Sequence, residues 1–359
     1  MSIRLLYIAS SITGLGGVSQ IMSEKVKTFI AQGIEVIIVS TNDESEVCFY
    51  PDLHQSKLIF YKEKVNRVKD IKAYYYFVKQ EVVDVFQPQV ILVIDNGIKG
   101  YFAPKYLRTK IPVYFECHGS RNSLKLQTKN WLKQQLILSC TAVLSFWFQG
   151  IIVLNTNSKK DWKGRKIIVI PNFIVQQNAN TYSTEVLHKR VIAVSRISPE
   201  KNIETLLKVW NKVYTQYPTW QLAICGGGEA AYMKELQRQA QGVVWYGEVR
   251  DVEQYIVQAD FLLHCSLMEG MPMVFLEAMN CAKPIVAFDV DFGPADLIQD
   301  NKSGFLVAKN NIEQCVQKVN YLIEHPEQIQ QMGREAHKSL SRFDKDVVVQ
   351  QWLTFFQSL

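Results

Sequence analysis

The sequence predicts an α/β protein made of two doubly wound domains, each a parallel sheet with helices on both faces. Short apolar segments typical of buried strands alternate with longer amphipathic segments along the whole chain. The alternation begins again after a polar stretch, residues 172–189, that has neither helical nor strand periodicity. A length of 359 residues also suits two domains of ordinary size better than one core.

Strands in the first half are expected at residues 4–10, 35–40, 90–95, 113–117, 151–155 and 167–171. Strands in the second half are expected at residues 190–195, 221–226, 243–247, 260–265 and 284–289. The main helices are expected near residues 19–32, 68–84, 202–217, 229–240, 251–258, 273–281 and 311–323. We therefore expect one domain over residues 1–172, a second over 173–342 and a closing amphipathic helix over 343–359. Ligands of such sheets bind beyond the carboxyl ends of the strands, so the site is expected where both sets of strand ends face each other.

The composition, with 48% hydrophobic and 21% charged residues, is typical of a soluble globular protein. The seven cysteines show no Cys-x-x-Cys or Cys/His ligand spacing, which predicts reduced and mostly buried thiols. The N-terminus runs directly into a strand pattern without the features of a signal peptide. We expect a cytoplasmic protein.

Charge is distributed unevenly along the chain. Residues 1–180 hold 23 Lys and Arg against 13 Asp and Glu, whereas residues 181–359 hold 17 against 21. A basic half beside an acidic half suggests that one domain faces something anionic, such as nucleic acid, a phosphorylated substrate or a membrane surface.

The longest apolar run, residues 136–155, could be taken for a membrane span. Gln149 and Gly150 interrupt it, and its helical part is short for a bilayer. We therefore interpret it as a buried helix followed by a buried strand.

A glycine-rich loop follows the first expected strand. Residues 10–22 read SSITGLGGVSQIM, in which Gly14, Gly16 and Gly17 allow a tight turn and close approach of an anion to a helix N-terminus. The spacing is not that of a dinucleotide fingerprint, and no acidic residue ends the second strand. A plain turn and a ligand loop both remain open.

A basic loop follows the first strand of the second half, where residues 195–207 read SRISPEKNIETLL. Arg196 and Lys201 flank a turn, and Asn202 caps the next helix or lies one place inside it. Two cations beside a helix start suit a diphosphate, although a solvated basic turn is the alternative. A second glycine-rich turn, residues 226–228, follows the next strand.

Residues 269–279, EGMPMVFLEAM, carry two glutamates in an apolar stretch. Pro272 suits the first turn of a helix, so Glu269 is expected just outside it. Glu277 would lie about five residues inside, or ~7.5 Å along the axis. The amides of residues 271–274 lie at the start of the helix and have no helical carbonyl to which they can donate. A carboxylate, a set of free amides and a second carboxylate, in this order, suit one ligand that has a sugar at one end, a diphosphate in the middle and a ribose at the other end. Nothing in the spacing requires the pair of acids that a glycosidase uses.

These segments together resemble the donor-binding half of glycosyltransferase family 4, retaining enzymes of the GT-B fold with two Rossmann-like domains facing a cleft. The resemblance covers most of residues 190–310, and Glu269 and Glu277 match that family's Glu-x7-Glu signature. It is thinner in the first half, where it is carried by Gly16-Gly17, by His118-Gly119 and by the IPN triplet at 170–172.

The resemblance implies roles for individual residues. Arg196 and Lys201 would neutralise the diphosphate of a nucleotide-sugar, most simply UDP-linked, and stabilise it as a leaving group. Glu277 would bind the ribose hydroxyls, and Glu269 would hold the 3- and 4-hydroxyls of the donor sugar near the reacting carbon. His118 would help to orient donor and acceptor.

Further donor contacts are implied around these residues. Gly16 and Gly17 would let the first loop approach the phosphates and the sugar, and the backbone of the signature segment would line the same site. That segment comprises Gly270, Met271, Pro272 and Met273. The resemblance implies no metal and no cofactor, and retention by a same-face mechanism.

The resemblance also implies that the last helix crosses back to the first domain, with Trp352, Phe355 and Phe356 on its buried side. Two details depart from the commonest family pattern. Met271-Pro272 replaces Phe-Gly, and related bacterial surface-polysaccharide transferases often show EGFPM at this place. A His-Cys-Ser strand end replaces Pro-Ser, and we interpret His264 as a core histidine.

Acceptor recognition is expected from the basic first half. Residues 123–136 place Lys125, Lys129 and Lys133 on one helical face among apolar residues, and residues 62–79 add five cations before Lys79 and a Tyr-Tyr-Tyr-Phe run. Both segments suit an anionic membrane surface that displays a lipid-linked or surface-glycan acceptor, with two solvated helix faces as the alternative. No nucleic-acid-binding motif is present, and we expect no nucleic acid partner.

The sequence therefore predicts a retaining glycosyltransferase that moves a hexose or N-acetylhexosamine to a lipopolysaccharide, capsule or O-antigen acceptor. We expect a cytoplasmic enzyme that is peripheral on the membrane. The alternatives are a sugar-nucleotide epimerase of the same fold and a non-catalytic membrane- or glycan-binding protein. The intact set of Arg196, Lys201, Glu269 and Glu277 argues against the second alternative.

Overall fold

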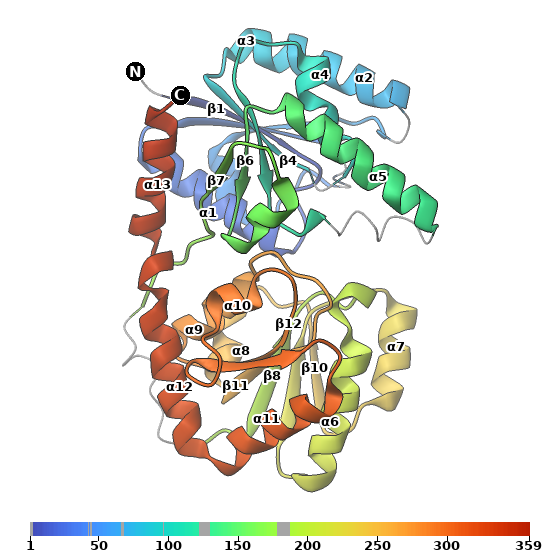
Figure 1. Ribbon diagram of the computed structural model, residues 1–359, viewed down its shortest axis with the longest axis vertical. Coiled ribbons are helices and arrows are strands. Elements are labelled where there is room, and N and C mark those ends of the chain that lie inside the picture. The colour runs from blue at the N-terminus through green and yellow to red at the C-terminus, as the bar shows by residue number, and fades with distance from the viewer. Residues whose placement is uncertain are drawn as a thin grey trace. The chain divides into compact units, whose positions relative to one another are not determined.

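The computed structural model describes residues 3–41, 43, 45–65, 68–95, 97–121, 130–177 and 187–359. The chain divides into two units, Met1–Asn172 with Val348–Leu359, and Phe173–Val347. Each unit contains one parallel sheet with helices packed on it (Figure 1). The two sheets that the sequence predicts are therefore confirmed.

The sheet of the first unit has the strand order β3-β2-β1-β4-β5-β6-β7. Its strands are β1 Arg4–Ala9, β2 Glu35–Ser40, β3 Lys57–Phe60, β4 Val90–Ile94, β5 Val113–Cys117, β6 Gly150–Val153 and β7 Ile167–Val169. The order reverses at β1, which pairs in parallel with β2 on one side and with β4 on the other. The sequence did not predict β3, because this edge strand has four residues and is exposed or half-buried throughout.

The main helices of the first unit are α1 Gly17–Ala31, α2 Val68–Phe77, α4 Ala103–Leu107 and α5 Trp131–Leu144. A π-helical turn, Val78–Val83, joins α2 to the short α3, Asp84–Phe86. Short 3-10 turns lie at Pro51–Gln55, Gly100–Phe102, Ser145–Trp147 and Asn157–Trp162. The strands they cover are almost fully buried, which is why their sequences are continuous apolar runs.

The prediction of a buried helix in residues 136–149 was wrong. Thr141 and Leu144 are the buried residues of α5. Large apolar side chains of α5 and of the turn after it are exposed instead, namely Trp131, Leu132, Leu136, Val143, Phe146 and Trp147. An apolar run therefore predicted the helix but not its environment. Lys125 and Lys129 lie outside the described residues, and Lys133 is exposed.

The Tyr-Tyr-Tyr-Phe run was interpreted as part of a docking surface, and this was wrong for its first two residues. Tyr74 and Tyr75 belong to the hydrophobic core of the first unit. Their rings pack on each other with centroids 4.9 Å apart, and Tyr75 donates a hydrogen bond to the carbonyl of Lys99. Tyr76 is the exposed tyrosine of the run.

The closing helix is α13, Lys345–Gln357, and its residues from Val348 onward belong to the first unit. Trp352, Phe355 and Phe356 are buried. Trp352 and Phe356 pack edge-on against Phe29 of α1, with ring centroids 5.7 and 5.4 Å away. The amphipathic pattern of residues 343–359 thus reflects packing on the first unit.

The sheet of the second unit has the order β10-β9-β8-β11-β12-β13. Its strands are β8 Arg190–Val194, β9 Gln221–Cys225, β10 Val243–Gly247, β11 Phe261–His264, β12 Ile285–Asp289 and β13 Gly304–Ala308. Its helices are α6 Ile203–Gln216, α7 Ala230–Gln239, α8 Glu253–Val257, α9 Met273–Asn280, α10 Pro294–Leu297, α11 Ile312–Glu324 and α12 Pro326–Lys338. The order reverses at β8, between β9 and β11.

Three of these elements, β13, α10 and α12, were not predicted. The signal for α12 was present in the sequence, because Ile329, Met332, Gly333 and Ala336 follow helical spacing and are buried. The signal for β13 was present too, because Gly304–Ala308 is a short apolar run that follows a polar turn.

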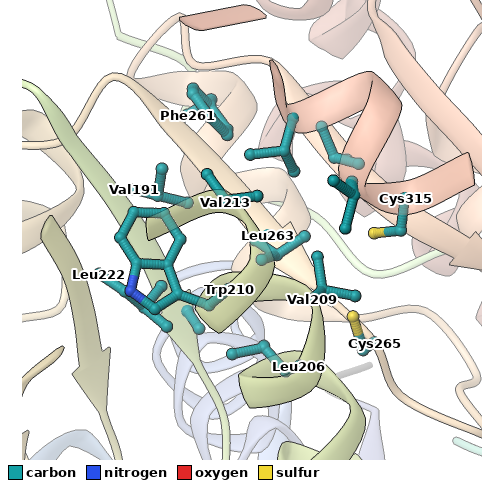
Figure 2. Close-up of a cluster of buried hydrophobic side chains, with 14 of the residues drawn as sticks. Val191, Leu206, Val209, Trp210, Val213, Leu222, Phe261, Leu263, Cys265 and Cys315 are labelled. Atoms are coloured by element: carbon teal, nitrogen blue, oxygen red, sulfur yellow. The ribbon is translucent and has the colours of Figure 1, made fainter. Parts of the chain in front are cut away.

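The core of the second unit is organised around α6 (Figure 2). Trp210 is fully buried among strand residues, and its indole nitrogen donates to the carbonyl of Gln241 at 2.8 Å. Cys265 and Cys315 also belong to this core. All seven cysteines are free thiols and six of them are buried, which confirms the expectation from their spacing.

Candidate functional site

The reversal of strand order in the second sheet identifies where a ligand site is expected. Strand β8 pairs with β9 on one side and with β11 on the other, so the segments that leave β8 and β11 diverge at their carboxyl ends. Open α/β sheets bind their ligands at this point. The segment after β8 carries Arg196 and Lys201, and the segment after β11 carries Glu269.

Glu269 is held by two basic side chains at this point. Its Oε1 lies 2.7 Å from Nζ of Lys201 and 2.7 Å from Nε2 of His264. Glu269 is 9% exposed. Burial would raise the pKa of this carboxyl, but the Lys201 charge and the His264 hydrogen bond outweigh it and hold the pKa well below its usual range. Glu269 is therefore ionised at neutral pH.

Both partners of Glu269 use the same oxygen. Across the described parts of the chain, no hydrogen bond reaches the other oxygen, Oε2. Ionised carboxylates accept several hydrogen bonds, so Oε2 has the capacity to accept a further one.

His264 has a role that sequence reasoning missed. It is buried and packs edge-on against Phe275 with centroids 5.0 Å apart, as a core histidine would. Its Nε2 nevertheless bonds Glu269, and because that carboxylate can only accept, Nε2 donates. The signal was its position, at the last residue of a strand that ends beside the site.

The segment after β8 is tied to the segment after β11 by several hydrogen bonds. Asn202 is the N-cap of α6 with φ of 55°, and its Nδ2 donates to the carbonyl of Cys265 at 3.1 Å. The carbonyl of Glu200 accepts from the amide of Leu267 at 2.9 Å and from Oγ of Ser266 at 3.2 Å. The contact between Lys201 and Glu269 is therefore held by backbone as well as by charge.

Arg196 is oriented differently from Lys201. Its side chain is 64% exposed, and Nη2 lies 3.3 Å from Oε1 of Glu200. An exposed pair of this kind contributes little to stability and breaks easily. Arg196 is thus available to a ligand at small cost.

The glycine turn after β9 packs directly on the segment that holds Arg196. A Cβ at Gly226, where φ is +142°, would lie 1.8 Å from the carbonyl oxygen of Ser195. A Cβ at Gly228 would lie 2.2 Å from that of Ile197. The amide of Ile197 also donates to the carbonyl of Gly227 at 2.7 Å. These glycines are needed so that two backbones can meet.

The signature segment leads into α9, which begins at Met273, as the expected range of 273–281 has it. Pro272 is the N-cap, with φ of −67° and ψ of 120°, and lies outside the helix instead of in its first turn. Met271, Pro272 and Met273 are buried. Glu277 is the half-buried fifth residue of α9.

In the first unit, the glycine-rich loop lies between β1 and α1, where the order of that sheet reverses. Gly16 is the N-cap of α1 with φ of 168°, an extended conformation open to any residue. Among the described residues, and apart from the adjoining residues of the chain, no atom lies within 4 Å of a Cβ built at Gly14 or Gly16. Packing within the protein therefore does not explain why these two positions are glycine.

Asp43 anchors the start of this loop. It accepts hydrogen bonds from Oγ of Ser11, the amide of Ile12, and the amide and Oγ1 of Thr13, at 2.6 to 3.0 Å. Ser40 also donates to it. Partial burial would raise the pKa of Asp43, but these hydrogen bonds lower it. Sequence reasoning missed Asp43 because it considered only residues directly at the end of the second strand.

His118 follows β5 and bonds a buried carboxylate. Its Nε2 lies 2.7 Å from Oε1 of Glu116, and its side chain is 2% exposed. A buried pair of Asp95 and Lys99, 3.7 Å apart, follows the neighbouring strand β4. Sequence reasoning did not single out Glu116, Asp95 or Lys99, although polar residues at the ends of apolar strands mark such sites.

Of the predicted site residues, Lys201 and Glu269 are in direct contact. Arg196 and Glu277 lie on elements that flank this contact, and Gly16, Gly17 and His118 belong to the first unit. Within the described residues, no group of three or more His, Cys, Asp or Glu side chains could hold a metal ion. Searching the same residues for a helix long and apolar enough to cross a membrane also finds none.

Comparison with known proteins is consistent with this geometry. Residues 183–339 match the family model described as "Glycosyl transferases group 1". An "Uncharacterized glycosyltransferase" of Haemophilus influenzae is 25% identical over 97% of this chain and 98% of its own length. A poly(ribitol-phosphate) alpha-N-acetylglucosaminyltransferase of Staphylococcus aureus is 28% identical over 58% of this chain, but only 44% of that enzyme is matched.

Solved structures match over almost the whole chain. A mutant of S. aureus TarM, in complex with fondaparinux, alpha-GlcNAc-glycerol and UDP, has a TM-score of 0.81 at 15% identity, covering 99% of both chains. Anabaena HepE in complex with UDP-glucose has a TM-score of 0.79 at 19% identity, covering 99% of this chain and 100% of that one. At these identities the likeness shows the fold, which is GT-B, as the sequence predicts.

Proposed function

We propose that this chain is a retaining glycosyltransferase of family 4 that transfers a hexose or N-acetylhexosamine from a UDP-sugar. The observation that carries the proposal is the contact of Lys201 and His264 with one oxygen of an ionised Glu269, at the point where the second sheet reverses its strand order. This arrangement presents an anion and a cation side by side. A sugar diphosphate has the complementary pair of groups, hydroxyls next to negative charge.

Each part of the donor has a counterpart in the second unit. The free oxygen of Glu269 accepts a hydrogen bond from a hydroxyl of the donor sugar. Lys201 and the exposed Arg196 face the diphosphate, and the first-turn amides of α9 add partial positive charge. Glu277, one turn and a half further along α9, receives the ribose hydroxyls.

The same groups act in the reaction. The bond between the anomeric carbon and the diphosphate oxygen breaks, and negative charge develops on the leaving diphosphate. Lys201, aligned by Glu269, and the exposed Arg196 stabilise that charge, so no metal ion is required for it. The carboxylate of Glu269 stabilises the positive charge on the sugar ring. The acceptor oxygen bonds the anomeric carbon from the face that the diphosphate leaves, and its proton passes to the diphosphate.

Gly16 supports a ligand role for the first loop. Its backbone conformation suits any residue and its Cβ position is open, so the loop leaves room for a ligand beside its backbone. A phosphate or sugar that approaches the backbone of residues 16 and 17 closely would exclude a side chain there.

The relatives support UDP and a surface glycan. UDP or UDP-glucose is bound in the structures of TarM and HepE. The named relatives include enzymes for poly(ribitol-phosphate) and for amylovoran of Erwinia amylovora. We propose a bacterial surface polysaccharide, such as lipopolysaccharide, capsule or O-antigen, as the acceptor class.

We also propose that the enzyme works in the cytoplasm, attached to the inner face of the cytoplasmic membrane. The exposed apolar side chains of α5, with exposed Lys133 on the same helix, have the composition of an interfacial helix. Lys105 lies 5.2 Å from the ring centroid of Trp147 and adds positive charge at the end of this surface.

Ligand binding tests the donor. The thermal transition of the protein is measured with UDP-, GDP- and ADP-sugars, and with Lys201→Ala as the matched variant. Stabilisation by a UDP-sugar that is lost in Lys201→Ala is expected. Stabilisation by a GDP-sugar and by no UDP-sugar would overturn the choice of base.

Product analysis tests the reaction. Incubation with a UDP-sugar and a lipid-linked glycan should give a product whose anomeric configuration, measured by NMR, equals that of the donor. Inversion would contradict the retaining mechanism. If the protein forms an epimer of the UDP-sugar in the absence of acceptor, its activity is epimerisation and the proposal of sugar transfer is wrong.

A further inference from the structure

A buried ion pair lies in the first unit, away from the basic residues used above. Lys25 of α1 and Glu116 of β5 form a salt bridge in which both side chains are 0% exposed. Burying two charges is expensive, and an apolar pair of similar volume is often as stable or more so. A stabilising role therefore does not explain why this pair is present.

Glu116 bonds a third group through the same oxygen. Oε1 of Glu116 receives Lys25 and also lies 2.7 Å from Nε2 of His118. Burial would raise the pKa of Glu116, but Lys25 and His118 outweigh it and lower the pKa to about 2. The group is a carboxylate at neutral pH and can only accept, so Nε2 of His118 carries the proton.

This assignment leaves one ring nitrogen of His118 for other partners. Within the described residues, Nδ1 has no hydrogen bond, and it is not one of the fully enclosed unpaired atoms. The second oxygen of Glu116 is such an atom. The network thus fixes Nε2 on Glu116, in a side chain that is 2% exposed, and leaves Nδ1 as the ring nitrogen for a further partner.

Helix α13 covers the same network. Nζ of Lys25 lies 4.4 Å from the ring centroid of Trp352, which is fully buried. A cation over an indole ring is stabilised, and more so when water is excluded. Lys25 lies two turns along the helix that begins at Gly17, so the network joins α1, β5 and α13.

The second unit repeats the arrangement. There too a carboxylate, Glu269, receives a lysine and a histidine on one oxygen. The two clusters differ in burial, because the side chain of Lys201 is 19% exposed and that of Lys25 is 0% exposed. The exposed cluster is suited to meet the donor, and the enclosed cluster is suited to orient a neighbour.

We propose that Glu116, held in place by Lys25 and Trp352, is a positioning residue that fixes the ring of His118 so that Nδ1, and not Nε2, is the nitrogen left for the substrate. The proposal rests on the proposed function, in which His118 orients donor and acceptor. Glu116 and Lys25 do not touch substrate themselves. They set the tautomer and the orientation of the imidazole, as outer carboxylates do for other functional histidines.

The test replaces the ion pair by an apolar pair. Lys25→Met with Glu116→Met keeps the volume, removes both charges and leaves no unpaired charge in the core. The matched control is Lys79→Met with Asp84→Asn, which removes an exposed ion pair of the same unit. Thermal unfolding and circular dichroism establish that each variant is folded.

The first readout is the Nε2 proton of His118, observed by NMR with ¹⁵N-labelled histidine and assigned by its absence in His118→Gln. In the wild type we expect a downfield, slowly exchanging resonance. In the apolar-pair variant we expect it to disappear, and in the control we expect it unchanged. Its absence from the wild type, or its survival without Glu116, would overturn the proposal.

The second readout is the kinetics of sugar transfer. Misorientation of a catalytic group by about 1 Å lowers the rate by about 10²-fold, so kcat should fall while the KM for the donor keeps its wild-type value. In the His118→Gln background the same apolar pair should have no further effect on kcat. A full additional loss in that background would mean that the pair acts on something other than His118.

Two outcomes, an unfolded variant and an inactive wild type, are interpreted separately. If the apolar-pair variant does not fold, Glu116→Gln replaces it, and loss of kcat only in the presence of His118 is expected. If the wild type transfers no sugar, the proposed function fails, and the Nε2 resonance alone decides whether Glu116 positions His118.

Discussion

Lys201 and Glu269 lie 68 positions apart in the sequence, and their side chains meet with Nζ 2.7 Å from Oε1. They meet because β8 and β11, the strands before them, are neighbours where the order of the second sheet reverses. A diphosphate would therefore bind to a lysine already aligned by Glu269, which lowers the entropy lost on binding.

Glu269→Gln should reduce sugar transfer. Removing one preorganised charged partner of a transition state lowers kcat by about 10²–10³-fold, and Lys201→Gln should have an effect of similar size. Transfer from a UDP-sugar, measured at saturating donor, checks both values. The control is Lys212→Gln, which breaks an exposed ion pair with Glu313 in the same unit and should leave kcat unchanged. Unchanged transfer in Glu269→Gln would remove this residue from the donor site.

The pair of Lys201 and Glu269 should also make the unfolding free energy depend on pH. The pKa of Glu269 is lowered in the folded state, so its contribution is complete above the unfolded pKa of about 4.3 and is lost as the pH falls through the folded value. At neutral pH, breaking a buried pair costs about 3 kcal/mol of unfolding free energy. Urea unfolding of wild type and Glu269→Gln between pH 7 and pH 3 should show a gap that narrows in acid. A gap that widens toward pH 3 would contradict the sign.

The sequence predicted the parts of the site that depend on strand ends. A strand followed by Arg196, Lys201 or Glu269 has to place these residues at one edge of a parallel sheet, and the reversal at β8 brings two of them together. The sequence could not predict which oxygen of the Glu269 carboxylate accepts hydrogen bonds, or which side chains donate them. His264 has the burial of a core residue, and only the structure shows that its Nε2 reaches Glu269.

The environment of a helix was less predictable than its existence. The apolar run from residue 136 predicted a buried helix, yet Leu136 is 64% exposed and Val143 is 62% exposed. Conversely, Lys25 reads as a surface cation of α1 and is fully buried against Glu116 and Trp352. In both cases the burial of the side chain depends on whether distant parts of the chain pack against it, and the local segment alone does not show this.

Gly16→Ala separates ligand binding from folding. Because its Cβ position is open and its φ of 168° suits any residue, unfolding free energy should stay within about 0.5 kcal/mol of wild type. If the loop approaches the donor as proposed, the KM for the UDP-sugar should rise about tenfold or more, since a misplaced contact of ~1.4 kcal/mol suffices. Isothermal titration of the UDP-sugar gives the same comparison without turnover. Wild-type affinity in this variant would leave the glycine without a ligand role.

Gly228→Ala should behave in the opposite way. The added Cβ would lie 2.2 Å from the carbonyl oxygen of Ile197, so one backbone has to move. Overpacking of this kind typically destabilises by about 1–3 kcal/mol. Because Ile197 follows Arg196, donor binding should weaken together with stability. Urea unfolding and titration of the same variant measure both, and a fully stable variant would show that the turn relaxes freely.

Trp352→Ala tests how strongly the closing helix is held on the first unit. Trp352 is fully buried against Phe29, Phe355 and Phe356, and it covers Nζ of Lys25. Loss of a buried tryptophan costs about 3–5 kcal/mol of unfolding free energy, through lost contacts and the cavity that remains. Urea unfolding followed by circular dichroism measures this loss.

Trp131→Ala is the matched control for this loss, since the same ring is removed from an exposed position of α5. Its unfolding free energy should stay within about 0.5 kcal/mol of wild type. If α5 contacts a membrane as proposed, the Trp131→Ala variant should bind less to vesicles that contain anionic lipid, as measured by co-sedimentation. The Trp352→Ala variant should unfold at a lower urea concentration than the wild type. A large stability loss in Trp131→Ala would mean that the ring is packed inside the protein, and the α5 surface would then lose its role as a docking face.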